Sequence, residues 1–522
     1  MLSFLAKKTT KNYLRGFSTN IISEQVLQRT IQRCSERNIV IPTYDEMFNP
    51  QLIPNEIQND LSNIGLWDIN PRNLFRVTWK NEQKEFGGGF GGANYIEIPK
   101  ELSGVDARII VLLGKYLPTG SHKVGASFGP IVEKLVRGGF DPTTQKALWP
   151  STGNYCRGGA FNSELLGCQS LAVMPEGMSQ ERFDWLESIG SEIYRTKSTE
   201  SNIKEIFTKM HQLEKEMGDS LVVLNQFTEF ANPMWHYAVT GRTMEELYNQ
   251  LATPRSNFKG LFLNQGSGGT LGSSMYLHQK FPNMKTACGE AIQCPTLLEN
   301  GYGKHRIEGI GDTYVPWILN LKDMDLLVGI DDQDCVDLLR LFNEKPGQEF
   351  LLKKGVEKSL VDRLSVFGIS SIGNLLGAIK FAKYYEMKKD DFIFTVATDS
   401  AALYQSRLKS FNQKLGGYTQ ENAISHYYGS LMKQNIQYMQ ELSYYEKKRC
   451  HHLKYFTWVE QEGKSVKELD QQWDDDYYWI ERMEEYKNLN HLIRSFNQRS
   501  KDLKKSYSIP KYSYKENEAS FH

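Results

Sequence analysis

The stretch PTGSHKVGAS, residues 118–127, places one lysine among small residues that offer it little to pack against. Lys123 is followed by Val124, Gly125 and Ala126, and it comes soon after the apolar run ARIIVLLGKY. A lysine can condense with a carbonyl group when its amine is partly desolvated and the carbonyl compound has room to reach it. The small neighbours provide that room, although a lysine in such a stretch is more often an ordinary turn residue. The stretch therefore indicates catalysis only if the rest of a site accompanies it.

A glycine-rich segment, NQGSGGTLGSS, follows the apolar run GLFL and precedes a predicted helix. Backbone N–H groups at a helix start attract anions, so this segment is suited to a dianionic phosphate. A sequence such as GSGG serves as a linker as often as it cradles a phosphate. The candidate phosphate-binding residues are Gly266, Ser267, Gly268, Gly269 and Thr270.

Two more candidate segments follow predicted strands. STGNYCRGGAF comes after KALWP, which places Asn154 in a strand-to-helix turn whose backbone amides suit a carboxylate. The candidate carboxylate-binding residues are Ser151, Thr152, Gly153 and Asn154. In ATDSAALYQSR, Ser400 comes directly after a predicted strand, and HRIEGIGDTYVP, residues 305–316, supplies a glycine-containing loop.

The elements that must position these segments alternate between residues 105 and 400. Short apolar runs predict buried strands, and longer amphipathic stretches predict helices. Such alternation predicts an α/β fold with mostly parallel sheets covered by helices on both faces. In these sheets, binding sites form in the loops at the carboxyl ends of the strands. The predicted strands are ARIIVLL, KALWP, QSLAVMP, SEIYRT, SLVVLN, KGLFLN and FIFTVAT.

Composition limits the classes of partner. The chain has 522 residues, with 62 Lys and Arg against 62 Asp and Glu, so no net charge attracts nucleic acid. We expect small-molecule or protein partners. The cysteines are scattered without a C-x-x-C pair, which favours a reducing compartment and argues against a disulfide framework or a zinc module; we expect no metal site. They are Cys34, Cys156, Cys168, Cys288, Cys294, Cys335 and Cys450.

Residues 1–20 are basic and rich in hydroxyl and apolar residues, and no acidic residue precedes Glu24. This composition predicts a mitochondrial transit peptide and a mitochondrial matrix location, and the alternative is a basic disordered N-terminus. No run of about eighteen apolar residues follows, so we expect no transmembrane segment. Residues 21–92 form an N-terminal extension, and residues 411–522 form a helical extension rich in aromatic and charged residues. The latter is expected to pack on the core or on another subunit.

Taken together and in this order, the segments resemble the cysteine synthase and cystathionine β-synthase family of fold-type-II pyridoxal-phosphate enzymes, within the tryptophan synthase β-like superfamily. The resemblance covers about residues 93–410. It implies two three-layer α/β/α lobes: a large cofactor-binding lobe from 93–125 and 226–410, and a small mobile lobe from 126–225. The matching segments are PTGSHK, STGN, AVMPEGMSQERF, QFTEFANPMWHYAVTG, GSGGTLG, HRIEGIGDTYVP, GISSIGNLLGA and TDS.

The resemblance also assigns roles to the candidate residues. It implies that Lys123 forms a Schiff base with pyridoxal 5'-phosphate, that Asn154 hydrogen-bonds the ring hydroxyl, and that residues 266–270 bind the phosphate. Ser400 would hydrogen-bond the pyridine nitrogen. A hydroxyl partner leaves that nitrogen near neutral, which favours chemistry at Cβ. Residues 151–154 would hold the substrate carboxylate, and a homodimer is expected.

The implied activity is β-replacement or β-elimination on serine-, O-acylserine- or cysteine-like amino acids through an aminoacrylate, with a thiol or sulfide as co-substrate. Two alternatives stay open: a dehydratase or deaminase, and an enzyme-derived structural subunit of a mitochondrial assembly held through the two extensions. The chain departs from the family pattern after Lys123 and after Asn154. His122, Cys156 and Arg157 therefore have either a role in the site or an ordinary structural or surface role.

Overall fold

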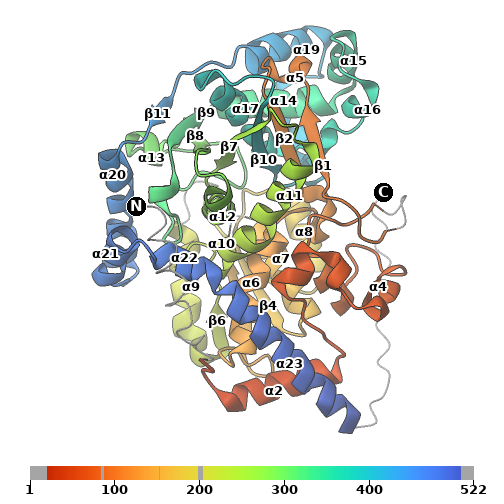
Figure 1. The fold of residues 1–522 in the computed structure, drawn as a ribbon, viewed down its shortest axis with the longest axis vertical. Coiled ribbons are helices and arrows are strands. Elements are labelled where there is room, and N and C mark those ends of the chain that lie inside the picture. Colours follow the sequence, from red (N-terminus) through yellow and green to blue (C-terminus); the bar gives the residue numbers. More distant parts are fainter. Residues whose placement is uncertain (1–19, 84–87, 152, 198–203, 507–522) are drawn as a thin grey trace.

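The computed structural model describes residues 20–83, 88–151, 153–197 and 204–506. The predicted transit peptide lies, apart from residue 20, outside the described residues, and so does Thr152. Two β-sheets form the centres of two lobes, and helices cover them (Figure 1). This arrangement confirms the predicted α/β fold class with mostly parallel sheets.

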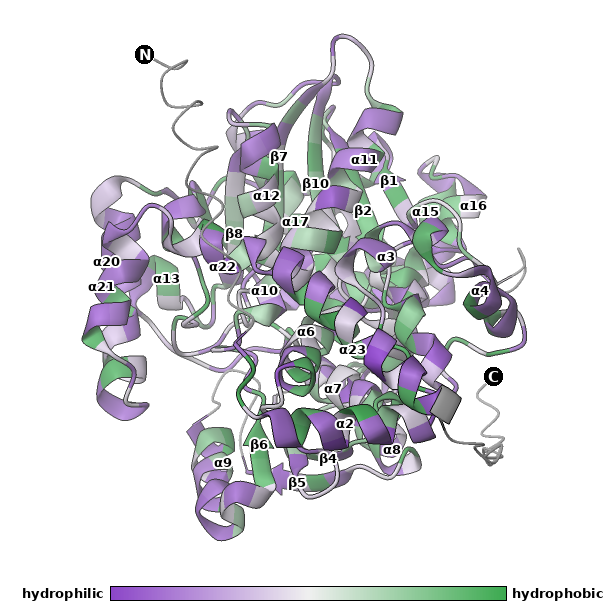
Figure 2. Ribbon diagram, turned by 60° about the horizontal axis from the view of Figure 1, so that its bottom comes forward, coloured by the Kyte–Doolittle hydropathy of each residue, from purple (hydrophilic) through white to green (hydrophobic). Residues whose placement is uncertain are grey.

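The larger sheet has the strand order β1-β2-β10-β7-β8-β9-β11. Its inner strands are parallel, whereas β1 and β11 pair antiparallel at the two edges. Alternate residues of the inner strands belong to two separate apolar clusters, one on each face, as in a three-layer lobe. Figure 2 shows the apolar residues along these strands. The strands are β1 (Tyr95–Ile98), β2 (Arg108–Leu113), β7 (Asn257–Asn264), β8 (Lys285–Ala291), β9 (Leu326–Ile330), β10 (Asp391–Ala397) and β11 (Met439–Glu441).

The smaller sheet is parallel throughout, in the order β5-β4-β3-β6. Leu148 and Leu171 face α9 (Lys204–Met217), whereas their neighbours Trp149 and Ala172 face the opposite side, where α7 (Asn154–Leu165) packs. This alternation buries both faces, as expected of a parallel sheet. The strands are β3 (Lys146–Pro150), β4 (Gln169–Pro175), β5 (Glu192–Thr196) and β6 (Leu221–Val223).

The remaining helices fall into three groups along the chain. The N-terminal helices are α2 (Glu24–Glu36), α3 (Tyr44–Phe48), α4 (Asn55–Leu61) and α5 (Lys100–Ser103). The helices of the two lobes are α6 (Lys123–Val136), α8 (Gln180–Ser188), α10 (Ala231–Trp235), α11 (Arg242–Leu251), α12 (Gly272–Lys280), α13 (Thr296–Glu299), α14 (Asp332–Asn343), α15 (Lys345–Lys353), α16 (Lys358–Val361), α17 (Ile369–Tyr384) and α18 (Gln405–Leu415). The C-terminal helices are α19 (Gln420–His426), α20 (Tyr444–Lys454), α21 (Val466–Asp474), α22 (Tyr478–Glu484) and α23 (Tyr486–Ser506).

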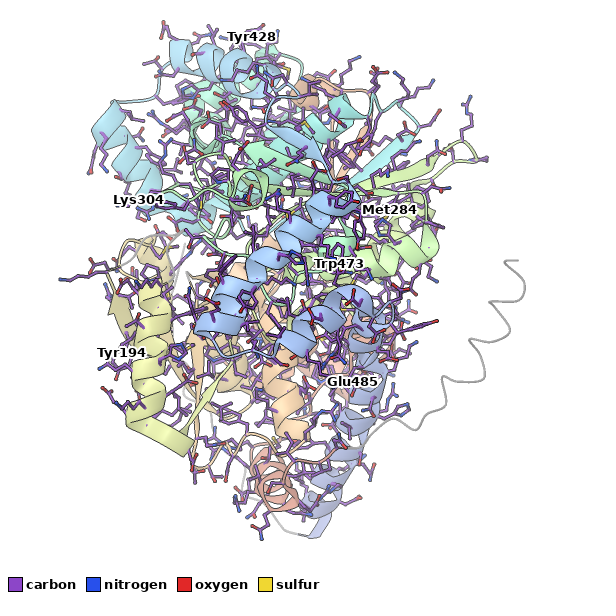
Figure 3. All side chains as sticks on the ribbon, turned by 90° about the vertical axis from the view of Figure 1, so that its left-hand side faces the viewer. Tyr194, Met284, Lys304, Tyr428, Trp473 and Glu485 are labelled. Atoms are coloured by element: carbon purple, nitrogen blue, oxygen red, sulfur yellow. The ribbon has the colours of Figure 1, made fainter. Side chains whose placement is uncertain are left out.

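The C-terminal extension packs on the core of its own chain. Helix α23 lies beside α2 (Figure 1), and the Asn490 side chain accepts a hydrogen bond of 2.8 Å from the Tyr44 backbone. Figure 3 shows the α20–α22 region, with Trp473, across one side of the molecule. The buried Lys454 amine donates to the carbonyls of Trp317 and Leu319 at 2.9 and 2.7 Å. The two extensions are therefore part of one packed body with the lobes.

The structure differs from the sequence-based expectations in three places. The extension is not wholly helical, because β11 adds an edge strand to the larger sheet. Strands β1, β8 and β9 were not predicted. Helix α6 begins at Lys123 itself, so the predicted lobe boundary at 125/126 falls inside this helix. Within the residues described, no helix combines the length and apolar character needed to cross a membrane.

Candidate active site

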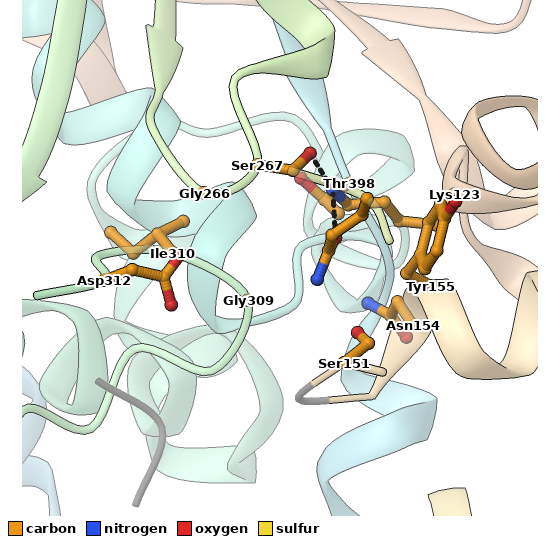
Figure 4. A pocket seen from close by; sticks show the side chains of 11 residues that line it. Lys123, Ser151, Asn154, Tyr155, Gly266, Ser267, Gly309, Ile310, Asp312 and Thr398 are labelled. Carbon is orange, nitrogen blue, oxygen red and sulfur yellow. Dashed lines mark hydrogen bonds between the residues drawn. The ribbon is translucent and has the colours of Figure 1, made fainter. Parts of the chain in front are cut away.

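Lys123 begins α6, and its side chain faces a pocket between the loops of the two sheets (Figure 4). Its Nζ atom donates to the Ser267 hydroxyl at 3.0 Å and to the Gln226 amide oxygen at 3.4 Å. Burial lowers the pKa of the Lys123 amine to about 8, and the nearby Asp312 carboxylate partly opposes this shift. About a tenth of the amine is therefore unprotonated at pH 7, far more than for an ordinary lysine, and the unprotonated form is the one that a nucleophile or base requires.

The pocket brings together five of the residues predicted from the sequence. The predicted residues on its wall are Lys123, Ser151, Asn154, Gly266 and Ser267. The others described, namely Gly153, Gly268, Gly269, Thr270 and Ser400, are not among the residues that line it.

Thr398 lines the pocket two residues before Ser400, at the carboxyl end of β10. Ser400 itself is buried and precedes a short 3₁₀ turn. Its assignment to a ring nitrogen therefore stays a prediction.

The glycine-rich loop connects β7 to α12 and is held by Asn232. The Asn232 amide donates to the Gln226 carbonyl at 2.9 Å and to the Ser267 hydroxyl at 3.2 Å. A Cβ atom on Gly269 would lie 2.0 Å from the Asn232 side-chain oxygen, so only glycine permits this approach. Gln226 and Ser267 are the two residues that accept hydrogen bonds from Lys123, so Asn232 helps to position that amine.

Gly269→Ala is expected to push Asn232 away and to destabilise the protein by about 1–3 kcal/mol, the usual cost of overpacking. Cofactor affinity should fall at the same time, because Ser267 loses its support. Gly417→Ala is the matched control, since a Cβ atom there meets nothing within 4 Å. Urea unfolding and cofactor titration of both variants measure the effects, and equal behaviour of the two would contradict this role of Gly269.

Asn154 hydrogen-bonds to a buried ionic cluster, formed by Arg182, Glu308 and Asp399, that joins the two lobes. Its amide donates to the Asp399 carboxylate at 2.6 Å, and the Tyr404 hydroxyl donates to the same oxygen at 2.8 Å. Arg182, on α8 of the small lobe, lies 3.7 Å from Asp399 and 2.7 Å from Glu308. Burial raises the pKa of Asp399, whereas Arg182 opposes the shift. The charged side chains that fix Asn154 thus come from both lobes.

The sequence did not decide the roles of three residues near the site, and the structure shows that each is buried in the protein interior. His122 packs against Trp79 and His236, with ring centroids 6.1 and 5.0 Å apart, and burial lowers its pKa to about 3. The Cys156 thiol is buried, which raises its pKa and makes it unreactive. The Arg157 guanidinium lies over Trp67 and Trp185, at 5.3 and 4.9 Å from the ring centroids.

Arg157 is therefore not a surface arginine. Only 1% of it is exposed, and burial lowers its pKa to about 9.

The pKa of Lys123 predicts a pH dependence of folding stability. In the unfolded chain the amine titrates near 10.5, so between pH 8 and 10.5 the unfolded state binds more protons and stability rises with pH. The contribution is about 3 kcal/mol. In cofactor-free protein, the free energy of unfolding of the wild type should gain that much relative to Lys123→Ala over this range. Parallel curves for the two proteins would contradict the lowered pKa.

The donors at the pocket fit a cofactor that carries an aldehyde and a phosphate. The amine of Lys123 suits the aldehyde, and the glycine-rich loop before α12 suits the phosphate. Within the described part of the chain, the buried Asn154 Oδ1 and Tyr155 hydroxyl have no hydrogen-bond partner, although both residues line the pocket. Unpaired buried polar atoms of this kind are expected where a bound group supplies the partner.

Sequence reasoning missed several residues of the pocket wall, among them Gln226, Gly309, Asp312 and Thr398. Gly309 and Asp312 lie in the 305–316 loop, which the sequence analysis identified as a family-like segment without giving a role to any of its residues. The sequence feature that could have identified this loop is the pair of glycines on either side of Ile310. In the structure, Gly309 and Gly311 adopt φ values of +102° and +70°. Such backbone conformations favour glycine and mark a sharply shaped loop.

Comparisons with known proteins agree with this geometry. The family model described as "Pyridoxal-phosphate dependent enzyme" matches residues 88–349, half of the chain. Cystathionine β-synthase of Saccharomyces cerevisiae is 26% identical over 324 residues, which cover 60% of this chain and 59% of the yeast protein. Cysteine synthase of Staphylococcus aureus is 27% identical over 317 residues, or 60% of this chain and 93% of the bacterial enzyme.

Solved structures are similar in fold. Cysteine synthase of Entamoeba histolytica superposes with a TM-score of 0.53 at 21% identity, covering 65% of this chain and 93% of the other. A hydrogen sulfide-producing enzyme of Fusobacterium nucleatum gives a TM-score of 0.51 at 24% identity, covering 60% of this chain and 96% of the other. With the matched family model, these findings confirm the fold-type-II prediction and the pyridoxal phosphate cofactor: the chain belongs to the family of pyridoxal-phosphate-dependent enzymes.

Proposed function

We propose that this enzyme catalyses β-replacement on a serine- or cysteine-like amino acid, with a thiol or sulfide as the second substrate. The observation that carries the proposal is the Lys123 amine, which faces the pocket at hydrogen-bond distance from Ser267. Cysteine synthase and cystathionine β-synthase relatives at 26–27% identity support the reaction type. Pyridoxal phosphate, when bound, withdraws electrons from Cα so that a proton can leave Cα and a substituent can leave Cβ.

Different residues of this chain would have different roles in the reaction. Lys123 would hold the cofactor through its amine and would act as the general base that takes the proton from Cα. Its pKa of about 8 leaves part of the amine unprotonated at neutral pH. The glycine-rich loop and the start of α12 bind the phosphate through backbone N–H groups. The unpaired Oδ1 of Asn154, at the start of α7, would accept a hydrogen bond from the ring hydroxyl of the cofactor, and Ser151, just before α7, would orient the substrate carboxylate.

The test incubates purified protein and pyridoxal phosphate with serine, cysteine or O-acetylserine, each with and without a thiol. The proposal predicts a thioether or new thiol amino acid whose formation depends on the thiol. Release of a 2-oxo acid and ammonia at the same rate without thiol would instead identify a dehydratase or deaminase. A protein that converts none of these substrates would favour the structural-subunit alternative.

Location and assembly are part of the same proposal. The basic composition of residues 1–20 supports import into the mitochondrial matrix. We expect a homodimer, and a larger mitochondrial assembly is the alternative. A fusion of residues 1–20 to a fluorescent protein tests the location, and cytosolic fluorescence would contradict it. Analytical ultracentrifugation tests the dimer.

A further inference from the structure

Asp312 supplies the pocket with a carboxyl group that the roles assigned above leave unused. Among the described residues that line the pocket, it is the only one with a carboxyl group. Its exposed fraction is 5%, and Figure 4 shows it on the side of the pocket away from Tyr155 and Asn154. A carboxyl group taken out of water costs free energy unless a ligand or a neighbouring charge compensates it, so a purely structural explanation is weak.

The loop that carries Asp312 is held rigidly. The Thr296 hydroxyl donates to the Asp312 carbonyl at 2.8 Å, and the Gly311 N–H donates to the Gln265 carbonyl at 2.8 Å. His305 accepts from the Ile307 N–H through Nδ1, which leaves its Nε2–H to donate to the Gly311 carbonyl at 2.8 Å. Such backbone support fixes the direction of a side chain, as a group that must meet a reacting atom requires.

The Asp312 carboxyl group is suited both to donate and to accept a proton. Burial raises the pKa of its carboxyl group to about 7, and the Lys123 amine limits the shift. A general acid–base group works best when its pKa lies near the working pH, because it can then give a proton in one step and take one in the next. Lys123 has its own proton to move at Cα, so a second group is free to act at Cβ.

We infer that Asp312 is the general acid and base at Cβ, and that the enzyme therefore prefers substrates whose β-substituent is a hydroxyl or thiol, such as serine and cysteine. The inference rests on the proposed function. Hydroxide is a poor leaving group because its conjugate acid, water, has a pKa of about 15.7. The sulfur of cysteine likewise leaves more readily with a proton, as hydrogen sulfide. A carboxylate such as acetate, whose acid has a pKa near 4, leaves without a proton.

The steps balance as follows for serine. Lys123 takes the Cα proton, the Cβ–O bond breaks, and the oxygen leaves with the bonding electron pair and the proton of Asp312 as water. An incoming thiol then gives its proton to the Asp312 carboxylate while its sulfur forms the Cβ–S bond. Lys123 returns a proton to Cα. Serine and a thiol thus give a thioether amino acid and water, with no oxidant or reductant.

The test compares the Asp312→Asn holoenzyme with the wild type on serine and on O-acetylserine, using the same thiol. Loss of general acid catalysis should lower kcat/KM for serine by about 100-fold or more. At the same neutral pH, single-turnover release of acetate from O-acetylserine should slow by less than about 5-fold, because acetate leaves without a proton. Equal losses with both substrates would overturn the inference.

A second readout separates catalysis from misfolding. Exchange of the serine Cα proton with D₂O, followed by NMR, reports on Lys123 alone, and it should persist in Asp312→Asn. The visible absorbance of the bound cofactor should also persist. Loss of exchange or of cofactor binding along with turnover would make Asp312 a structural residue and contradict the inference. A wild type inactive with every substrate would instead refute the proposed function.

Discussion

Replacing Lys123 by alanine is expected to lower the rate of β-replacement by about 10³-fold or more, because one side chain both holds the cofactor and moves the Cα proton. The fold should survive. The amine lies in surroundings that lower its pKa to about 8, so the wild-type protein already accepts the cost of removing an ammonium group from water. Alanine removes that cost, together with the hydrogen bonds to Ser267 and Gln226.

The matched control is Lys115→Ala, which changes a lysine in the loop after β2 that does not line the pocket. Its turnover should stay within about twofold of the wild type, as expected for a substitution outside the catalytic machinery. Steady-state kinetics and thermal unfolding of both variants make the comparison. Lys123→Ala protein that retains a tenth or more of the wild-type kcat would show that another group performs these steps.

Arg182→Met is expected to cost about 3–5 kcal/mol of folding stability, the typical penalty for leaving buried charges without their partner. Arg182 is 1% exposed, and its guanidinium lies 2.7 Å from the Glu308 carboxylate and 3.7 Å from Asp399. Glu308 keeps an ion pair with Arg407 at 2.6 Å in this variant. Most of the lost stability therefore comes from Asp399, which is left without a cationic partner. Asp399 in turn holds the Asn154 amide, and cofactor binding should weaken together with stability.

Arg195→Met is the control for this variant, since Arg195 pairs with Glu187 at the surface, where both side chains are about half exposed. A pair of that kind contributes at most about 1 kcal/mol. Urea unfolding followed by tryptophan fluorescence measures both variants. Losses of similar size in the two would contradict the structural role of the buried cluster.

The chemistry of the site was largely predictable because it lies in short segments. Lys123, Ser151, Asn154, Gly266 and Ser267 were selected from local motifs, and the pocket brings them together. The parallel strands explain this result. Loops that follow the neighbouring parallel strands β2, β10 and β7 meet at the carboxyl edge of the larger sheet, so the strand pattern indicates that their motifs are neighbours. The loop after β3 belongs to the smaller sheet, and only the structure brings it to the same pocket.

What could not be predicted depends on contacts between distant segments. Asp312 is a charged residue in a loop without a strand-like or helix-like pattern, and only the fold shows that it lines the same pocket as Lys123. For Arg157 the sequence left a role in the site or a surface position open, yet two tryptophans from separate segments enclose it. Strand β11 is three residues long, too short for any periodicity to reveal, and it forms because β9 offers an unpaired edge.

The central claim is that Lys123 is the residue that binds pyridoxal phosphate covalently. Borohydride reduction of the holoenzyme, followed by proteolysis and mass spectrometry, tests it most directly, because reduction makes the attachment permanent. The predicted result is a single pyridoxyl-modified peptide with the modification on Lys123. Modification of another lysine with a lowered pKa, such as Lys380, or a protein that carries no modification, would contradict the account.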